Sequence, residues 1–253
     1  MSDEVAEMNP SLYAAKQQLR SAMKQRLSAL SHDSVTSQSH AIFNTLLRFK
    51  PYVDAKRVSI FLAMPSAEVQ TDEIVRHALK DGKQVYVPYL HKPTVQPAGT
   101  PPRVMDMVRL TDVHDYESLR RDKWGIPSID PATVNQRQRV LGDAVEQPSA
   151  DLSVLDLILM PGVAFDIDEK NGNIRRLGHG KGFYDFFLHR YATRMASVEP
   201  RDPPLSLYAL ALSEQFIPSP SEGTVPVGPF DQPLDGLILG NGEVKLSPPD
   251  QNT

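Results

Sequence analysis

The spacing of hydrophobic and polar residues predicts alternating helices and strands along most of the chain. Over residues 11–30, leucine and methionine recur at close to helical spacing, which predicts an amphipathic helix. Three further helices are expected, over residues 34–48, 71–80 and 183–195. Short apolar runs bounded by glycine, proline or charged residues predict six buried strands, over residues 58–63, 84–89, 106–110, 155–160, 207–212 and 234–239.

This alternation indicates an α/β fold in which helices cover a parallel or mixed sheet. A chain of 253 residues could form one large α/β domain or two small ones. Because neither an internal repeat nor a second self-contained core is evident, we expect one domain over residues 1–253, with an ordered core of about residues 11–240.

Three segments lack such a pattern. The proline-rich residues 91–103 predict a surface loop inserted between two strands. Residues 135–150 predict a polar connector without apolar periodicity. The tail after Asn241 is polar and contains two prolines, so we expect it to be disordered.

Composition and charge narrow the classes of function. The net charge of −4 argues against a general nucleic-acid-binding surface, so any basic patch must be local. No apolar run approaches the length of a membrane span, and we expect no membrane partner. The absence of cysteine excludes disulfides, thiolate metal sites and a cysteine nucleophile. Residues 1–9 are acidic without a basic residue, which favours the cytoplasm over a leader-directed location, and a mitochondrial pool reached through an alternative start stays open.

The segment from Arg176 to Asp185 carries the strongest sign of chemistry. It reads Arg-Leu-Gly-His-Gly-Lys-Gly-Phe-Tyr-Asp, with three glycines at alternate positions between a predicted strand and a predicted helix. Because glycine has no Cβ, the backbone here can come close to a bulky ligand. Arg176 and Lys181 supply positive charge, and N–H groups at a helix start favour phosphate. The segment predicts a nucleotide phosphate site; the alternative is a tight glycine-rich turn without a ligand.

Charged residues at the end of this segment and elsewhere in the chain could complete such a site. Lys16 and Arg20 lie four positions apart on the first predicted helix, where they could clamp a polyphosphate or form a solvated face. Asp185 is well placed to hold Mg²⁺, although the helix dipole also favours an acid at this position. Asp231 and Asp235 bracket the turn before the last predicted strand, and either could reach a metal, although loop aspartates more often form the turn itself.

Two residues indicate contacts with an organic substrate. Glu68 follows a predicted strand, where α/β proteins place ligand contacts, although a single loop glutamate is usually a surface residue. Trp124 is the only tryptophan, and it predicts either a core anchor or a platform for a flat heterocycle. The seven histidines show no spacing typical of zinc ligands.

Taken over its whole length, the sequence resembles the 5-formyltetrahydrofolate cyclo-ligase family, also called methenyltetrahydrofolate synthetases. Six blocks carry the resemblance: Lys16-x-x-x-Arg20, residues 60–64 with Glu68 and Thr71, and residues 105–109, 124–127, 157–166 and 176–185. The last two blocks are the most specific. The resemblance implies a three-layer α/β/α fold with a parallel or mixed central sheet, of the NagB/RpiA/CoA-transferase type.

The resemblance also implies an activity and its ligands. Members of the family use ATP and Mg²⁺ to convert 5-formyltetrahydrofolate to 5,10-methenyltetrahydrofolate, with release of ADP and phosphate. The expected intermediate is an iminium phosphate, formed when the formyl oxygen is phosphorylated. The expected partners are therefore ATP as co-substrate, Mg²⁺ as cofactor, and 5-formyltetrahydrofolate with one or more glutamyl residues, bound by a monomer.

Carried over position by position, the resemblance assigns residues to four roles. ATP would be bound by Lys16, Arg20, Arg176, Leu177, Gly178, His179, Gly180, Lys181, Gly182, Phe183 and Tyr184. The folate would contact Arg20, Leu62, Glu68, Trp124, His179, Gly180, Lys181, Gly182 and Phe183. Mg²⁺ would be held by Asp185 and Asp231, and the catalytic set would be Lys16, Arg20 and Lys181.

The chain departs from the family pattern in three places. His179 stands where the family often has arginine, so a permanent cation becomes titratable. Phe183 replaces a common tyrosine and removes a hydroxyl group. Residues 167–175 and the loop after Leu90 are longer than usual, which could alter loop motion or substrate affinity without changing the type of reaction.

Two other classes of function compete with an ATP-dependent ligase. A non-catalytic folate- or nucleotide-binding protein of the same fold would bind ligands without turnover. The joint presence of Lys16, Arg20, Asp185 and Asp231 favours the enzyme. A sugar-phosphate isomerase-like protein on a related fold lacks support, because no convincing catalytic acid–base set is present.

Overall fold

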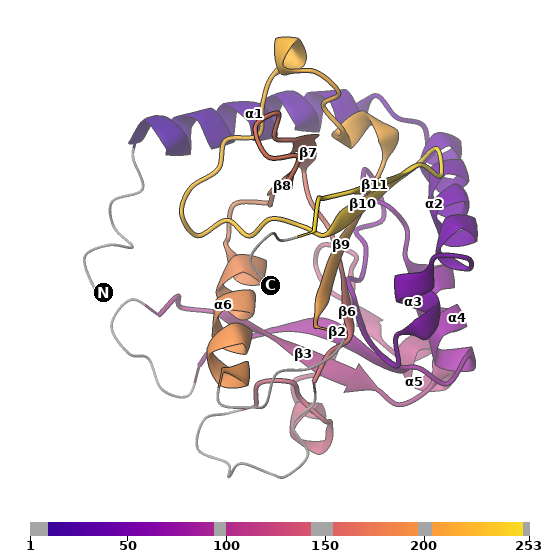
Figure 1. The fold of residues 1–253 in the computed structure, drawn as a ribbon. Helices are drawn as coiled ribbons and strands as arrows, with labels where there is room; N and C mark the ends of the chain where they lie inside the picture. The colour runs from indigo at the N-terminus through magenta and orange to yellow at the C-terminus, as the bar shows by residue number, and fades with distance from the viewer. Residues whose placement is uncertain (1–9, 94–99, 143–153, 197–203, 250–253) are drawn as a thin grey trace.

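The computed structural model describes residues 10–93, 100–142, 154–196 and 204–249 (Figure 1). The acidic residues 1–9 lie outside these ranges, as do parts of the expected loop 91–103 and connector 135–150. The helices within them are α1 (Pro10–Ser28), α2 (His32–Leu46), α3 (Lys50–Asp54), α4 (Asp72–Lys80), α5 (Val113–Glu117) and α6 (Phe183–Met195). Short 3₁₀ turns are η1 (Val134–Gln136), η2 (Ser213–Gln215) and η3 (Pro220–Glu222).

A seven-stranded sheet crosses the molecule in the order β11-β10-β9-β6-β1-β2-β3. Its strands are β1 (Arg57–Ile60), β2 (Gln84–His91), β3 (Val104–Leu110), β6 (Leu157–Met160), β9 (Ser206–Ala211), β10 (Gly236–Leu239) and β11 (Val244–Leu246). The edge strands β3 and β11 are antiparallel to their neighbours, and the strands between β10 and β2 run parallel. Two antiparallel ribbons lie outside this sheet, β4 (Arg120–Arg121) with β5 (Pro127–Ser128), and β7 (Ala164–Ile167) with β8 (Ile174–Leu177).

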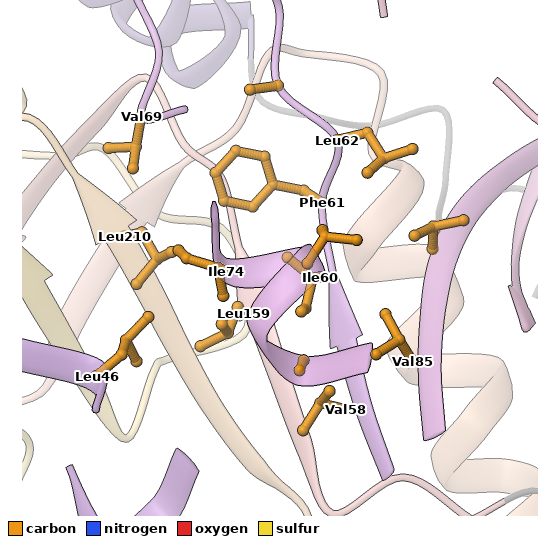
Figure 2. Close-up of a cluster of buried hydrophobic side chains, with 14 of the residues drawn as sticks. Leu46, Val58, Ile60, Phe61, Leu62, Val69, Ile74, Val85, Leu159 and Leu210 are labelled. Atoms are coloured by element: carbon orange, nitrogen blue, oxygen red, sulfur yellow. The ribbon is translucent and has the colours of Figure 1, made fainter. Parts of the chain in front are cut away.

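Helices cover both faces of the sheet, and the alternation of side chains along β6 shows why. Leu157 and Leu159 enter the core beneath α2, α3 and α4, whereas Ile158 and Met160 enter the core beneath α6. A strand buried on both faces is continuously apolar, as expected for a parallel sheet. Figure 2 shows part of the first core, with Leu159 beside residues of β1 and α4. The expected three-layer α/β fold is therefore confirmed.

The order of the strands fixes where a ligand can bind. From β1 the chain continues to β2 on one side, and after β3 it crosses back to β6 on the other side of β1. The strand order thus reverses between β1 and β6. In open α/β sheets, ligands bind outside the carboxyl ends of the strands at such a reversal. The loop after β1 and the hairpin after β6 are therefore the segments expected to carry the site.

Helix boundaries follow local chemistry. Ser31 begins α2, because its hydroxyl oxygen accepts a hydrogen bond from the N–H of Ser34 (3.1 Å). Pro51 was expected to stop the second helix, but α2 already ends at Leu46, and Pro51 instead lies in the first turn of α3, where its missing N–H costs nothing. The expected strand over residues 58–63 ends at Ile60, since the chain turns into the loop that carries Glu68.

One expectation was wrong. The tail after Asn241 contains a strand, β11, which pairs with β10, and the carbonyl of Glu243 just before β11 accepts the N–H of Leu239 in β10. Residues 167–175, which the sequence marks as longer than usual, contain the turn and inner ends of the hairpin β7–β8. The strands β7, β8 and β11 are short, and each forms because it pairs with a neighbour rather than because of its residue pattern.

Candidate active site

The glycine loop, residues 178–182, joins β8 to α6 at the carboxyl edge of the sheet. Gly180 has φ +92° and Gly182 has φ +63°, both in the left-handed region that side chains disfavour. Gly182 is the N-cap of α6, so the first N–H groups of this helix adjoin the loop. The loop is shorter than the sequence motif, because Arg176 and Leu177 belong to β8 and Phe183 opens α6.

Helix α1 lies along the hairpin β7–β8 and brings its cations to this loop (Figure 1). Met23 packs with Leu177 and with Ala164, Ile217 and Val225 in a small apolar cluster. Burial of one such side chain contributes about 1.5–3 kcal/mol, so the cluster fixes the helix over the hairpin. Arg20 lies one turn away, and its Nε donates to the carbonyl of Gly178 (2.9 Å).

Lys16 connects α1 to the segment before β10. Its side chain is buried, and its Nζ lies 2.5 Å from Oδ2 of Asp231. The same carboxylate accepts the N–H of Gly228, which ties the turn together. Burial lowers the pKa of the Arg20 guanidinium, and the nearby Tyr13 and Asp231 oppose that shift. Helix α1, the glycine loop and the turn that contains Asp231 thus meet around Lys16 and Arg20.

Arg176 lies behind the glycine loop rather than in solvent. Its side chain is 5% exposed, its Nη2 donates to Oδ1 of Asp185 (2.9 Å), and its Nη1 donates to the carbonyl of Pro161 (3.3 Å). A side chain on Gly178 would place its Cβ 2.9 Å from Arg176 Nη1, so glycine is needed for this approach. The guanidinium therefore holds Asp185 in place, and any direct contact with phosphate requires this ion pair to rearrange.

Glu68 faces the loop from the other side. Its side chain is buried, its Oε2 accepts the N–H of Met64 (2.8 Å), and its Oε1 lies 3.5 Å from Nε2 of His179. Tyr184 is close enough to both Glu68 and Arg176 to feel their charges, and Cζ of Arg176 is 5.6 Å from the tyrosine ring centroid. Burial raises the pKa of Tyr184; Arg176 opposes the shift and Glu68 adds to it. The Tyr184 hydroxyl is buried without a hydrogen-bond partner.

The remaining predicted residues differ in accessibility. Lys181 is exposed on the glycine loop, whereas Phe183 packs partly on the core beneath α6. Leu62 is buried, as Figure 2 shows, so only a small part of it can reach a ligand. Trp124 is 65% exposed, so the core-anchor interpretation is wrong. Its ring is available as a platform.

Sequence reasoning missed a buried residue that supports the site. Gln215 in η2 donates through Nε2 to the carbonyl of Gly162 (2.6 Å), and its Oε1 accepts the N–H of Leu212 (2.9 Å). It therefore joins the end of β9 to the turn that leads into β7. The hairpin itself is held by Asp166, which pairs with Arg175 and accepts the N–H of Val225 (2.8 Å). A glutamine in a polar loop carries no sequence signal for such a role.

The donor set suits one divalent ion rather than a preformed metal centre. Among the described residues, no group of three or more histidine, aspartate or glutamate side chains could hold a metal. Asp185 and Asp231 are both partly exposed and paired with cations. Mg²⁺ is commonly held by one or two carboxylates together with phosphate oxygens, so each of these carboxylates is of the type that could hold Mg²⁺ beside a bound polyphosphate. No helix in the described part of the chain is long and apolar enough to cross a membrane.

Comparison with known proteins shows which proteins this chain is similar to. The model of the 5-formyltetrahydrofolate cyclo-ligase family matches residues 13–240. The mouse 5-formyltetrahydrofolate cyclo-ligase is 34% identical over 225 residues, covering 89% of this chain and 93% of the mouse protein. The mitochondrial 5-formyltetrahydrofolate cyclo-ligase of Arabidopsis thaliana is 29% identical, covering 94% and 78%. The NMR structure of Aquifex aeolicus 5,10-methenyltetrahydrofolate synthetase supports the fold, with TM-score 0.59, 22% identity and coverage of 94% and 95%. The resemblance inferred from the sequence is confirmed.

Proposed function

The chain belongs to the 5-formyltetrahydrofolate cyclo-ligase family, and we propose that the residues around the glycine loop convert 5-formyltetrahydrofolate to 5,10-methenyltetrahydrofolate. The enzyme is an ATP-dependent ligase of one-carbon folate metabolism. The observation that carries the proposal is the meeting of α1, the glycine loop and the Asp231 turn around Lys16 and Arg20.

ATP would lie with its phosphates against the glycine loop. The N–H groups that begin α6 and the cations Lys16, Arg20 and Lys181 provide the positive potential that a triphosphate needs. Lys16 and Arg20 are held by Asp231 and by a backbone carbonyl, so they are oriented before the nucleotide arrives. Arg176 acts from behind the loop by orienting Asp185.

Mg²⁺ would be held by Asp185 and Asp231 with the phosphate oxygens. When bound, it would neutralise charge on the triphosphate and help to align the transferred phosphoryl group. Both carboxylates are now paired with cations, so phosphate oxygens would compete for those cations as the carboxylates turn to the metal.

The folate would bind between Glu68 and the glycine loop. The buried Glu68 carboxylate keeps one oxygen near His179, and it can accept N–H groups of the pterin ring. Gly180 and Gly182 let the loop backbone approach the ligand. The family resemblance would add Leu62, His179 and Phe183 to the folate contacts. Trp124 offers an exposed aromatic face for the rest of the folate.

The chemistry then needs positioning and charge neutralisation rather than a covalent enzyme intermediate. The formyl oxygen attacks the γ-phosphorus, the bond from that phosphorus to the β–γ bridging oxygen breaks, and ADP leaves. The product is an N5-iminium phosphate. N10 attacks its carbon, N10 loses its proton, and phosphate leaves as the methenyl bridge closes. Lys16, Arg20 and Lys181 stabilise the negative charge that moves between the phosphate groups.

An absorbance assay for methenyltetrahydrofolate tests this function. Purified protein, 5-formyltetrahydrofolate, ATP and Mg²⁺ should give product at a rate that falls to background when ATP is omitted. A non-catalytic binding protein would bind the same ligands without product. ADP formation that depends on the folate would distinguish coupled turnover from contaminating ATP hydrolysis. We also propose a cytoplasmic monomer; size-exclusion chromatography with light scattering and localisation of a tagged chain would test both points.

A further inference from the structure

A basic hairpin, residues 120–128, lies beside the segment that carries Glu68. Its turn is closed by Asp122, whose Oδ1 accepts the N–H groups of Trp124 (2.8 Å) and Ile126 (3.0 Å). Gly125, with φ +79°, lies so close to Pro65 that an added Cβ would be 2.6 Å from Pro65 Cγ. Because Pro65 follows Met64, whose N–H binds Glu68, the hairpin adjoins the expected pterin site.

The hairpin carries three exposed cations. Arg121 supports the turn, because its Nη1 donates to the carbonyl of Gly125 (2.6 Å). Lys123 lies over the Trp124 ring, with its Nζ 5.4 Å from the ring centroid. Within the described ranges, no carboxylate pairs with Arg120 or Lys123.

The acids nearest in sequence are already engaged. The Asp122 carboxylate caps the turn, and Glu117 pairs with Arg76 (3.1 Å). The whole chain has a net charge of −4, so this is a local excess of positive charge on an acidic protein. An exposed aromatic ring with a lysine over it, on a hairpin that carries a second cation without a carboxylate partner among the described residues, fits a ligand that joins an aromatic ring to carboxylates.

The proposed substrate joins an aromatic ring to carboxylates at the end opposite its pterin. A reduced folate continues from the pterin through a p-aminobenzoyl ring to a glutamate with two carboxylates, and each added γ-glutamyl unit brings another. We propose that the hairpin 120–128 binds this glutamyl end, with Arg120 and Lys123 pairing with carboxylates beside Trp124. The inference rests on the proposed function and extends it to the residues that bind the glutamyl end: Arg120 and Lys123 supply whatever affinity is gained with each γ-glutamyl unit, and salt weakens this gain.

The test compares 5-formyltetrahydrofolate carrying one or five glutamyl units. In the wild-type enzyme, KM for the pentaglutamyl form should be lower than for the monoglutamyl form, and the difference should shrink at high salt. In the double variant Arg120→Glu/Lys123→Glu, KM for the pentaglutamyl form should increase about tenfold or more, and KM for the monoglutamyl form about threefold or less. Arg121 is left unchanged because it supports the turn.

Lys80→Glu is the matched control. Lys80 is an exposed lysine at the end of α4, next to the start of β2 and therefore at the opposite edge of the sheet. This variant should keep the wild-type ratio of the two KM values. The inference would be overturned if the double variant kept the wild-type ratio of the two KM values. It would also be overturned if Lys80→Glu changed this ratio as much as the double variant does.

Binding without turnover separates this inference from the proposed function. Trp124 is the only tryptophan, so its fluorescence can follow titration with each folate in the absence of ATP. Quenching at lower concentrations of the pentaglutamyl form, lost in the double variant, would support the inference even if no product were formed. Product formation with equal quenching by both forms would overturn the inference and leave the proposed function standing.

Discussion

At Gly180 the absence of a side chain lets Arg20 approach the loop. A Cβ there would lie 3.0 Å from Arg20 Cζ and 3.2 Å from its Nη1, and the residue also has φ +92°. The same helix face carries Lys16, whose Nζ contacts Asp231. The site therefore depends on close packing between cations and backbone. Sequence reasoning could name the glycines and cations, but not which glycine faces which cation.

Gly180→Ala should damage activity more than stability. The positive φ alone costs about 1–2 kcal/mol for a residue with a Cβ, and displacement of Arg20 should lower kcat/KM at least about tenfold. Gly82→Ala is the control: Gly82 has φ +78° with nothing within 4 Å of the added Cβ, at the end of α4. Both variants should lose similar thermal stability, and only Gly180→Ala should lose activity. Equal activity in the two variants would contradict the contact with Arg20.

Lys16→Ala should raise KM for ATP. A hydrogen bond to a charged group is worth about 1.5–3 kcal/mol, which corresponds to about ten- to a hundredfold in affinity. Lys24→Ala is the matched control, because Lys24 is an exposed lysine on the same helix. Initial rates over a range of ATP concentrations measure both, with circular dichroism to verify that the variants fold. Unchanged ATP kinetics in Lys16→Ala would show that the lysine does not bind the nucleotide.

At the scale of the elements, the sequence predicted what repeats along the chain and missed what depends on pairing. The helices α1, α2, α4 and α6 were found because each has a periodic apolar face, and the parallel strands were found because each lies in a continuous apolar run. The hairpin β7–β8 and the edge strand β11 were missed because charged residues interrupt their short segments, whereas the equally short β1, β6 and β10 lie in apolar runs. The buried role of Arg176 was missed because its partner Asp185 comes close only after β8 and α6 form.

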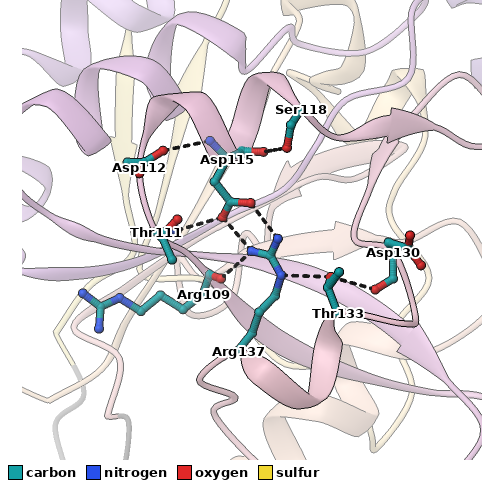
Figure 3. Close-up of polar contacts among 8 residues, drawn as sticks. All are labelled: Arg109, Thr111, Asp112, Asp115, Ser118, Asp130, Thr133 and Arg137. Atoms are coloured by element: carbon teal, nitrogen blue, oxygen red, sulfur yellow. Dashed lines mark hydrogen bonds and ion pairs between the residues drawn. The ribbon is translucent and has the colours of Figure 1, made fainter.

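A partly buried ion pair joins α5 to the segment after η1 (Figure 3). Arg137 donates through Nη1 and Nη2 to the two oxygens of Asp115 (both 2.6 Å), and Asp115 Oδ2 also accepts the N–H of Thr111 (2.9 Å). Asp115→Asn should lower the free energy of unfolding by about 2 kcal/mol, because Arg137 keeps its burial without an anionic partner. The melting temperature of the folded chain should fall by about 4–8 °C. Breaking the exposed pair of Lys50 and Asp54 with Lys50→Ala should change stability by less than about 0.5 kcal/mol.

The ion pair of Asp115 and Arg137 should make the stability of the fold depend on pH. Burial by itself would raise the pKa of Asp115, but the hydrogen bonds from Arg137 and Thr111 outweigh it and hold the pKa below its ordinary value of 3.8. A carboxylate with a lowered pKa stabilises the fold above its unfolded-state pKa and loses that contribution as pH falls through the folded-state pKa. The stability difference between wild type and Asp115→Asn should therefore narrow below about pH 4, as urea unfolding at several pH values can measure. A stability difference between the two proteins that stays constant down to about pH 2 would contradict this prediction.

At the scale of the whole molecule, the site joins segments that are far apart in the sequence. Lys16 and Asp231 are separated by 215 positions, and Arg20 and Gly178 by 158. The N-terminal helix, the hairpin after β6 and the turn before β10 therefore close on one another at the carboxyl edge of the sheet. A ligand that bridges these segments must stabilise the whole fold, because it binds only when all three are in place.

ATP with Mg²⁺ should therefore raise the melting temperature of the intact chain. At a concentration about 100 times Kd, binding contributes about 2.7 kcal/mol, or about 5–10 °C for a chain of this size. The part of the shift that requires Mg²⁺ should disappear in Asp231→Asn. The shift of this variant is measured against its own melting temperature without ligand, because the Asp231 carboxylate also holds Lys16 and the N–H of Gly228, and its loss can lower stability by itself. Asp54→Asn, which removes an exposed carboxylate on α3, should keep the full shift. If Asp231→Asn retained the Mg²⁺-dependent part, this aspartate would not be a ligand of the metal, and the ion would have to be held by Asp185 and the phosphates alone.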